Sequence, residues 1–401
     1  MPRKPMVTQG IGPLMKDLSL AAVMEAVPMS AAEKALKETG KESIRQRLLP
    51  AHLVVYLVIL LAFFADASVR ENLRTLLEAL RRRFGIGQIK PAVGSAITKA
   101  RIRLGREPFE RLFNDTARPL AEETIPGCYW RGFRVVAADG TSADVQSTPE
   151  NRNRYGVHTN QHGEVGYPAM KSVVLMECGT RAPLAAAIGG EHDDEGALFD
   201  RLRDHLSKDM LLLVDRYYHS FERFQACAER TGALVWRVKK SLHLLPIKRF
   251  EDGSYLAEIR PSNKLIRDGR SGGKERRIVR VVEYDPLFED GTVGERTRLI
   301  STLLDPVQAP AGELAGLYPQ RWSEETGFDE LKTHLRGPGR VLRSQLPDLV
   351  EQEFFGFLLA YYVVRATMTQ AAKTNGVTPA ELSFVHSVRV IRRKLAFPPS
   401  G

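Results

Sequence analysis

Cysteine is scarce in this chain of 401 residues, where only Cys128, Cys178 and Cys227 occur, far apart in the sequence. None of them belongs to a Cys-x-x-Cys pair, the spacing common in zinc sites and redox disulfides. The sequence therefore argues against a disulfide-rich scaffold and a structural zinc site, and it favours a reducing cytoplasm as the location of the protein.

Long apolar runs are also few. The run over 53–65 contains 13 apolar residues, which is short of the roughly 20 that a membrane-spanning helix needs. We therefore expect a buried core helix there and no membrane partner. The first residues, Met1-Pro-Arg-Lys-Pro, have no apolar stretch of the kind that a signal peptide requires.

Acidic residues are outnumbered, because 48 Asp and Glu stand against 58 Lys and Arg, a formal net charge of +10. The excess is concentrated in two stretches, with 11 basic against 5 acidic residues over 66–113 and 13 against 5 over 233–280. Such a balance favours a polyanionic partner but does not identify it.

Two regions precede residue 126. Residues 1–40 carry scattered Pro and Gly and are predicted to be a partly disordered segment, with a helix over 31–37. Residues 41–125 have helical patterns and are predicted to form an all-α domain. Ser68 and Glu71 form a capping-box signature, which predicts a helix that runs to residue 84.

A shorter helix is predicted over 95–104, after a connection that contains Gly and Pro. Lys99, Arg103 and Arg106 recur along one side of it. A short helix with a basic outer stripe, following a longer helix, is typical of a DNA-binding helix-turn-helix. A solvated helix face fits the same stripe, and the local excess of basic charge favours DNA.

From residue 126 the pattern changes to short strands. They are predicted at 133–138, 171–177, 184–188, 211–214 and 233–238, with helices at 194–206 and 221–230. Three strands followed by alternating helix and strand is the element order of an RNase H-like mixed sheet. The polar segment 146–168 is predicted to be a surface loop.

Two aspartates follow strand-like runs. Asp139 comes directly after 133–138, and Asp215 comes directly after the fully apolar run 211–214. An aspartate at the end of a buried strand is expensive to ionise unless positive charge compensates it. A turn former or helix N-cap is the alternative for each, and it is the stronger alternative at Asp139, because Asp-Gly is a common turn dipeptide.

The most informative segment places Tyr318, Arg321, Glu325 and Lys332 at spacings of three, four and seven residues. On an α-helix these positions share one narrow stripe. A carboxylate flanked by two cations and a phenol suits a site that binds a metal ion together with a phosphate. The alternative is a solvated helix face. For Tyr318 the alternative is a packing role, because the residue before Pro319 is biased away from the helix.

Together, Asp139-Gly-Thr, Asp215-Arg-Tyr-Tyr-His-Ser and the Tyr-Arg-Glu-Lys stripe resemble the three acidic signatures of the DDE transposases of bacterial insertion sequences. The stripe is similar to that of the insertion element four group in particular. The resemblance runs from about residue 44 to about residue 372. It implies an RNase H-like catalytic core over 126–340, a β-rich insertion, and a preceding all-α DNA-binding domain.

The resemblance also implies a function. Such an enzyme cuts the ends of an insertion sequence and joins the freed 3′-OH to target DNA. Three clustered carboxylates oppose each other's ionisation, and divalent cations remove that penalty. Because hard oxygen ligands select Mg²⁺ or Mn²⁺, we expect Asp139, Asp215 and Glu325 to be catalytic residues that bind two such ions.

The expected partners are double-stranded DNA, at the element ends and the target, and further copies of this chain. Arg321 and Lys332 are predicted to hold phosphates, and Tyr318 to bond or stack against the DNA end. Trp322 fits a base-stacking residue and a buried aromatic residue equally well. The resemblance implies a homodimer or higher oligomer during synapsis, in the bacterial cytoplasm and associated with the nucleoid.

Two further regions are predicted. Residues 239–297 form the insertion, with β-like pieces at 255–259 and 277–284, and either track DNA phosphates or form a solvated subdomain. A returning strand is expected at 299–303. Residues 341–401 form a C-terminal helical region whose long helix, 341–373, covers the sheet.

Three other functions remain as alternatives. One is a catalytically inactive or regulatory DNA-binding relative, although all three acidic positions are filled. Another is a nuclease of the same fold that does not transfer strands. A metal-independent hydrolase is disfavoured, because it leaves the basic regions without a role.

Overall fold

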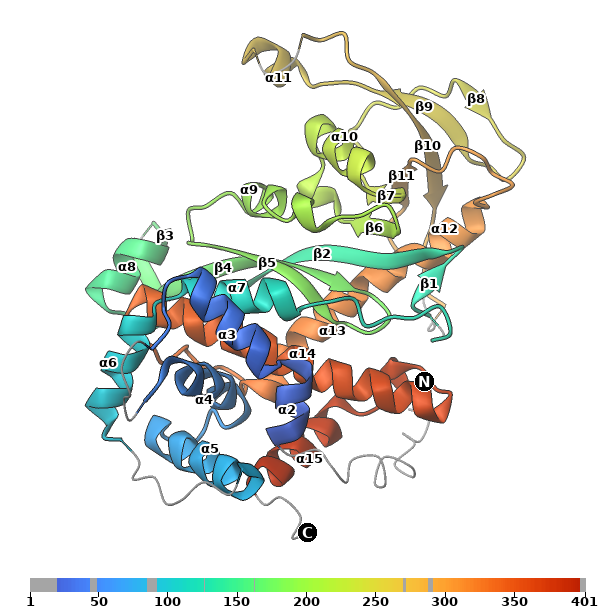
Figure 1. The fold of residues 1–401 in the computed structure, drawn as a ribbon. Helices are drawn as coiled ribbons and strands as arrows, with labels where there is room; N and C mark the ends of the chain where they lie inside the picture. Colours follow the sequence, from blue (N-terminus) through green and yellow to red (C-terminus); the bar gives the residue numbers. More distant parts are fainter. Residues whose placement is uncertain are drawn as a thin grey trace.

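One large mixed sheet crosses the molecule (Figure 1). A thick layer of helices covers one of its faces, and shorter helices lie on the other. The computed structural model describes residues 20–43, 49–84, 92–125, 127–161, 163–269, 272–287 and 291–396.

Five strands form the centre of the sheet, in the order β5-β4-β2-β6-β7. β4 is antiparallel to β2 and β5, whereas β2, β6 and β7 run parallel to one another. This arrangement is an RNase H-like mixed sheet, so the predicted fold class is confirmed. The strand bounds are β2 Phe133–Asp144, β4 Gly163–Glu177, β5 Pro183–Gly189, β6 Met210–Val214 and β7 Ala233–Arg237.

Alternate residues of β2 face two different cores, as expected for a strand that is covered on both faces. Val136 packs in the cluster that contains residues of α10 (Phe221–Arg230). Val135 packs on the opposite face, in the cluster that contains residues of α12 (Ala311–Leu317). The odd-numbered residues of β2 therefore face the segment that carries the predicted Tyr-Arg-Glu-Lys stripe.

The predicted insertion continues the sheet beyond β7. β11 (Thr297–Ser301) pairs antiparallel with β7 on one side and with β10 (Arg277–Tyr284) on the other. β9 (Tyr255–Ile259) and β8 (Lys248–Arg249) extend this antiparallel part to the sheet edge. The strands predicted at 255–259 and 277–284 are confirmed, and the returning strand lies two residues earlier than predicted.

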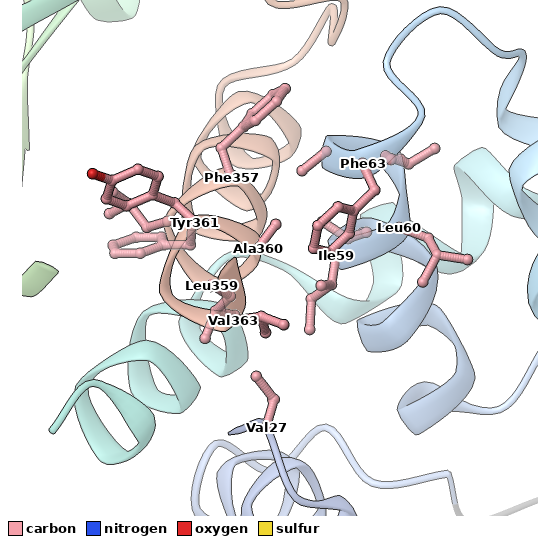
Figure 2. Packing of buried hydrophobic residues seen from close by; sticks show 14 of the residues in the cluster. Val27, Ile59, Leu60, Phe63, Phe357, Leu359, Ala360, Tyr361 and Val363 are labelled. Carbon is pink, nitrogen blue, oxygen red and sulfur yellow. The ribbon is translucent and has the colours of Figure 1, made fainter. Parts of the chain in front are cut away.

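Two helices at the centre of the helical layer come from opposite ends of the chain. Twelve of the thirteen residues of α4 (Ala51–Phe63) are buried, which confirms the predicted core helix. α4 packs against α14 (Pro347–Asn375), and Figure 2 shows Phe63 of α4 facing Ala360 of α14. A Cβ at Gly356 of α14 would come within 2.8 Å of a Val58 methyl carbon, so glycine permits this close approach.

The remaining N-terminal and C-terminal helices surround this pair in one shared apolar cluster. None of the described helices is long and apolar enough to cross a membrane. Because the two ends of the chain share a core, the domain boundaries at 40, 125 and 340 stay predictions. The helix bounds are α2 Leu20–Ala26, α3 Met29–Glu38, α5 Val69–Phe84, α6 Gly94–Leu104, α7 Glu107–Thr116 and α15 Phe384–Ala396.

Several local predictions were wrong. The segment 146–168 is not a loop, because Thr148 caps α8 (Pro149–Tyr155) and β3 (Val157–Asn160) then forms a hairpin with β4. The long helix predicted from 194 is a short α9 (Glu195–Asp200) followed by irregular turns. The segment 1–40 was predicted to be partly disordered with a helix at 31–37, and that helix lies within α3. Residues 20–40 are described and mostly helical, whereas 1–19 lie outside the described residues.

Candidate active site

Asp139 lies within β2 rather than at its end. The parallel pairing with β6 stops at Ala138 and Val214, whereas the antiparallel pairing with β4 continues to Asp144. The prediction of a strand-end aspartate was therefore wrong for β2 itself, because β4 keeps pairing beyond the point where β6 ends. Asp215 follows the last residue of β6, so both aspartates lie where β2 and β6 separate.

The backbone around each aspartate fixes its side chain. The Asp139 carboxylate accepts a hydrogen bond from the Gly140 N–H at 2.9 Å. The Asp215 carboxylate accepts one from the Tyr217 N–H at 3.0 Å, and its carbonyl oxygen accepts one from the Trp236 indole at 3.0 Å. Trp236 is fully buried, so the second signature is anchored to the core of the sheet.

Arg321 connects the sheet to the predicted stripe. Its guanidinium donates to Asp139 Oδ2 at 2.9 Å and to Glu325 Oε1 at 3.2 Å. The Arg321 side chain is 7 % exposed, Asp139 is 23 % exposed and Glu325 is 60 % exposed. One buried cation therefore holds a strand carboxylate and a helix carboxylate that are far apart in the sequence.

The surroundings of Asp139 oppose its ionisation, mainly through burial. Burial raises the pKa of Asp139 above its ordinary value, and the negative charge of Asp215 raises it further. The hydrogen bond from Gly140 and the positive charge of Arg321 lower the pKa but do not cancel the effect of burial. A second cation near Asp139 would favour the ionised carboxylate.

The stripe is not one regular α-helix. A 3₁₀ turn, Tyr318–Trp322, precedes α13 (Ser323–Asp329), and a π-helical turn, Glu330–Leu335 (η5), follows it. The assumption of a single α-helix was wrong, because Pro319 disturbs the first turn and the π turn changes the register.

The stripe residues consequently have different environments. Tyr318 is 4 % exposed, and its hydroxyl lies 3.4 Å from the Val214 carbonyl oxygen, so it has the packing role that was the alternative to a DNA contact. Trp322 is 45 % exposed, which fits a stacking residue. Lys332 is half-buried, one turn beyond α13.

The sequence did not single out two further acidic residues near Asp139. Glu324 is fully buried, and burial, followed by the negative charge of Asp139, raises its pKa far above the ordinary value. Glu195 lies beside Gly140, where a Cβ would come within 2.1 Å of Glu195 Oε1. This contact explains why glycine follows Asp139. The adjacent Glu324-Glu325 pair was the only sequence signal.

The predicted basic stripe of the N-terminal region is divided between two roles. Lys99 and Arg103 are exposed on α6. Arg106 lies beyond the helix and forms an ion pair with the buried carboxylate of Glu351 on α14. The buried Arg101 donates to the Leu349 carbonyl oxygen at 3.0 Å and so ties α6 to α14. The connection over 85–91 lies outside the described residues.

Comparison with known proteins gives two family matches. Residues 17–114 match the family "Insertion element 4 transposase N-terminal", and residues 130–363, more than half of the chain, match "Transposase DDE domain". Both matches agree with the helical and mixed-sheet parts described above.

Individual relatives agree with these families. The chain is 29 % identical over 368 residues to the transposase InsG for insertion sequence element IS4 of Escherichia coli K12, covering 90 % of this chain and 80 % of that protein. It is 28 % identical over 209 residues to the putative transposase InsZ of the same organism, covering 52 % and 67 %.

Among solved structures, a piggyBac transposase synaptic complex with hairpin DNA aligns with a TM-score of 0.46 at 10 % identity, covering 96 % of this chain and 81 % of that one. This likeness is too low to support an argument. On the family matches, the chain belongs to the DDE transposases of the insertion element 4 family and is a DNA transposase, a metal-dependent enzyme of DNA cleavage and strand transfer.

Proposed function

We propose that Asp139, Asp215 and Glu325 bind the divalent metal ions of this transposase and are its catalytic acids. The observation that carries the proposal is the guanidinium of Arg321, which hydrogen-bonds both Asp139 and Glu325. Asp215 lies on the neighbouring strand end, close enough for its charge to raise the pKa of Asp139. Arg321 therefore links two of the three acids of the family signature, and the third lies at the end of the strand beside one of them.

The donor set fits Mg²⁺ or Mn²⁺. All three side chains offer hard carboxylate oxygens, which are the ligands that these ions prefer. Within the described ranges no three His, Cys, Asp or Glu side chains already lie close enough together to hold a metal ion. Glu325, with its exposed side chain on α13, is the acid with most freedom to move.

Two bound ions would supply Lewis-acid activation of the attacking oxygen and charge stabilisation of the leaving 3′-oxygen. The residues of the chain position the reactants. Arg321 keeps Asp139 and Glu325 oriented, and Lys332 and the exposed Trp322 hold the DNA strand beside them. Water first cleaves a strand at the element end, and the freed 3′-OH then attacks target DNA.

Two other surfaces support DNA binding. Lys99 and Arg103 are exposed on α6, in the part of the chain that matches the N-terminal family. The insertion exposes Lys248 and Arg249 on β8, at the edge of the sheet. These cations suit sequence-independent phosphate contacts, and synapsis of two element ends requires at least two copies of the chain. The nucleoid as the location of these events is part of the same proposal.

The test uses the full chain, Mg²⁺ or Mn²⁺, and a labelled duplex that carries the DNA flanking the gene. Asp139→Asn, Asp215→Asn and Glu325→Gln are each expected to abolish cleavage and strand transfer. Asp204→Asn is the matched control, because the Asp204 side chain is 88 % exposed and takes no part in the site. Cleavage that survives Glu325→Gln contradicts the assignment, and cleavage without strand transfer by the unsubstituted chain identifies a nuclease.

A further inference from the structure

Arg280 on β10 is a fully buried arginine that connects two parts of the insertion region. Its guanidinium forms an ion pair with Asp252, which lies in the turn between β8 and β9. It also donates to the Ser254 hydroxyl at 2.8 Å in the same turn, and to the carbonyl oxygens of Asp305 and Ala309 in the segment before α12. One buried cation therefore joins the tip of the β8–β9 hairpin to the start of α12.

The Asp252 carboxylate completes this connection with both of its oxygens. Oδ1 accepts hydrogen bonds from the backbone N–H and the hydroxyl of Ser254, at 3.1 and 2.6 Å, which fix the carboxylate within the turn. Oδ2 accepts from Arg280 and from the Ala311 N–H at 3.0 Å. Ala311 is the first residue of α12, and Pro310 before it makes no side-chain capping bond. Asp252 therefore caps the start of α12 from a different part of the chain.

α12 leads directly to the active site. The 3₁₀ turn Tyr318–Trp322 follows it with helical backbone angles at the junction, and α13 follows that turn. From Ala311 to Arg321 the chain advances about 15 Å without leaving helical geometry. Arg321 in turn bonds Asp139 and Glu325. A displacement at the start of α12 is therefore passed on to the guanidinium that holds two of the proposed catalytic acids.

The position of α12 along its own axis depends on polar contacts. α12 packs beside β10 (Figure 1), and Leu314 is buried in the cluster against the sheet, but apolar contacts are not directional. An ion pair between Arg131 and Glu313 also involves α12, but these side chains are 42 % and 43 % exposed, and exposed pairs contribute little. The contacts of Asp252 are directional, and the partner Arg280 is shielded from water.

We propose that Asp252 is a positioning residue of the active site, which fixes α12 through Ala311 and so sets the place of Arg321. The inference rests on the proposed function, since it takes Arg321 to orient catalytic acids. It gives the insertion a role besides the phosphate contacts of Lys248 and Arg249, because the hairpin that carries these exposed cations also holds the catalytic segment. Loss of the contact is expected to slow cleavage without weakening DNA binding.

The experiment separates cleavage from DNA binding and from stability in the full chain. The double variant Asp252→Ala/Arg280→Met removes the buried ion pair as a whole, a replacement that often leaves stability unchanged. Its single-turnover rate of cleavage of the labelled duplex in Mg²⁺ is expected to fall about 100-fold, the cost of a displacement of about 1 Å at a catalytic group. Its Kd for the duplex in EDTA is expected to change by less than about twofold, since the surface cations remain.

Two further variants separate positioning from a structural role. Pro310→Ser, added to the double variant, gives α12 a cap of its own. It is expected to raise the urea midpoint while cleavage stays slow, because the new cap does not connect α12 to the hairpin. Glu313→Gln breaks the exposed ion pair on the same helix and is the matched control, expected to leave cleavage, affinity and urea midpoint unchanged.

Amide hydrogen exchange provides a readout that needs neither DNA nor catalysis. In the full chain, the double variant is expected to exchange the amides of 311–325 about tenfold faster than the unsubstituted protein, because the start of α12 is no longer fixed. The amides of β2 and β6 are expected to exchange at an unchanged rate, since the centre of the sheet is not altered.

Cleavage by the double variant at the unsubstituted rate overturns the inference, as does unchanged exchange over 311–325. Recovery of the cleavage rate with Pro310→Ser also overturns it, because Asp252 would then act only as a helix cap. If the unsubstituted chain cleaves nothing in Mg²⁺ or Mn²⁺, the proposed function fails, whereas faster exchange over 311–325 in the double variant still supports the positioning of α12 by Asp252.

Discussion

Glu325 and Glu330 lie five residues apart in the same broken helix, yet their surroundings differ completely. Glu325 is 60 % exposed and, within the described part of the chain, forms one ion pair, with Arg321 at 3.2 Å. Glu330 is 8 % exposed and accepts hydrogen bonds from Arg181 at 2.7 Å and from the Tyr361 hydroxyl at 2.8 Å. Arg365, fully buried on α14, lies 3.4 Å from Glu330 and completes the cluster.

The difference separates a carboxylate that holds the segment in place, Glu330, from the one that we propose to be catalytic, Glu325. The Glu330 cluster joins η5 to α14 and to Arg181, which follows β4, so it fixes the end of the segment that carries Glu325. Arg365 also donates to the Thr180 carbonyl oxygen at 2.6 Å. A catalytic carboxylate that must exchange partners is better held by one bond than by three, provided that a rigid neighbour sets its position.

Glu330→Gln should produce the largest effect on stability. It leaves the cations of Arg181 and Arg365 buried without a counter-charge, which is expected to lower the free energy of unfolding by about 3–5 kcal/mol. Urea unfolding measures the change. Glu325→Gln is the matched control and is expected to change stability by less than about 0.5 kcal/mol while abolishing cleavage. Equal destabilisation by both substitutions would break the comparison.

His219, in the same signature segment as Asp215, is expected to make the stability of the fold depend on pH. Its imidazole lies beside Trp236, and its buried Nε2 has no hydrogen-bond partner among the residues that the structure describes. Burial, followed by the charge of Lys239, lowers its pKa to about 4. The unfolded chain, with an ordinary pKa near 6.5, binds this proton first. Stability is therefore expected to fall as pH drops from about 6.5 to about 4, by up to about 3 kcal/mol.

The measurement for His219 is urea unfolding at several pH values, in the unsubstituted protein and in His219→Phe. Carboxylates titrate in both proteins, so the difference between the two curves isolates the imidazole. The variant is expected to lose less stability on acidification. Parallel curves would show that His219 is as free to take up a proton in the folded chain as in the unfolded one.

Metal binding should test the role of Glu325 without any catalytic assay. Mg²⁺ at about 100 times its Kd is expected to raise the free energy of unfolding by about 2.7 kcal/mol, because it binds the folded chain. Asp139→Asn and Glu325→Gln are expected to abolish this gain, and removal of the metal with EDTA to reverse it. A gain that persists in both variants would place the metal elsewhere.

Local sequence patterns predicted much of the fold. The apolar run 211–214 became β6, and the helix predicted at 221–230 became α10 with the same bounds. The alternating pieces at 255–259 and 277–284 became β9 and β10. In each case the pattern is set by residues within one element, which is the range over which hydrophobic periodicity carries information.

The parts that escaped prediction depend on contacts between distant residues. Nothing near Glu330 indicates that Arg181 will neutralise it, and nothing near Arg101 distinguishes its buried side chain from the exposed one of Arg103. Regular helical geometry placed Tyr318 on a surface stripe, but burial against β6 placed it in the core. Packing decided these outcomes, and packing is not visible in one sequence.

Two adjacent tyrosines of α14 provide the finest test of the comparison. The Tyr361 hydroxyl donates to the charged Glu330 at 2.8 Å, whereas the Tyr362 hydroxyl donates to the neutral Arg118 carbonyl oxygen at 3.2 Å. Hydrogen bonds to buried charges contribute more than neutral ones, so Tyr361→Phe is expected to cost about 2 kcal/mol and Tyr362→Phe about 1 kcal/mol. Urea unfolding of both variants measures the difference. Equal costs would mean that Arg181 and Arg365 alone satisfy Glu330, and that the cluster holds the catalytic segment through its ion pairs.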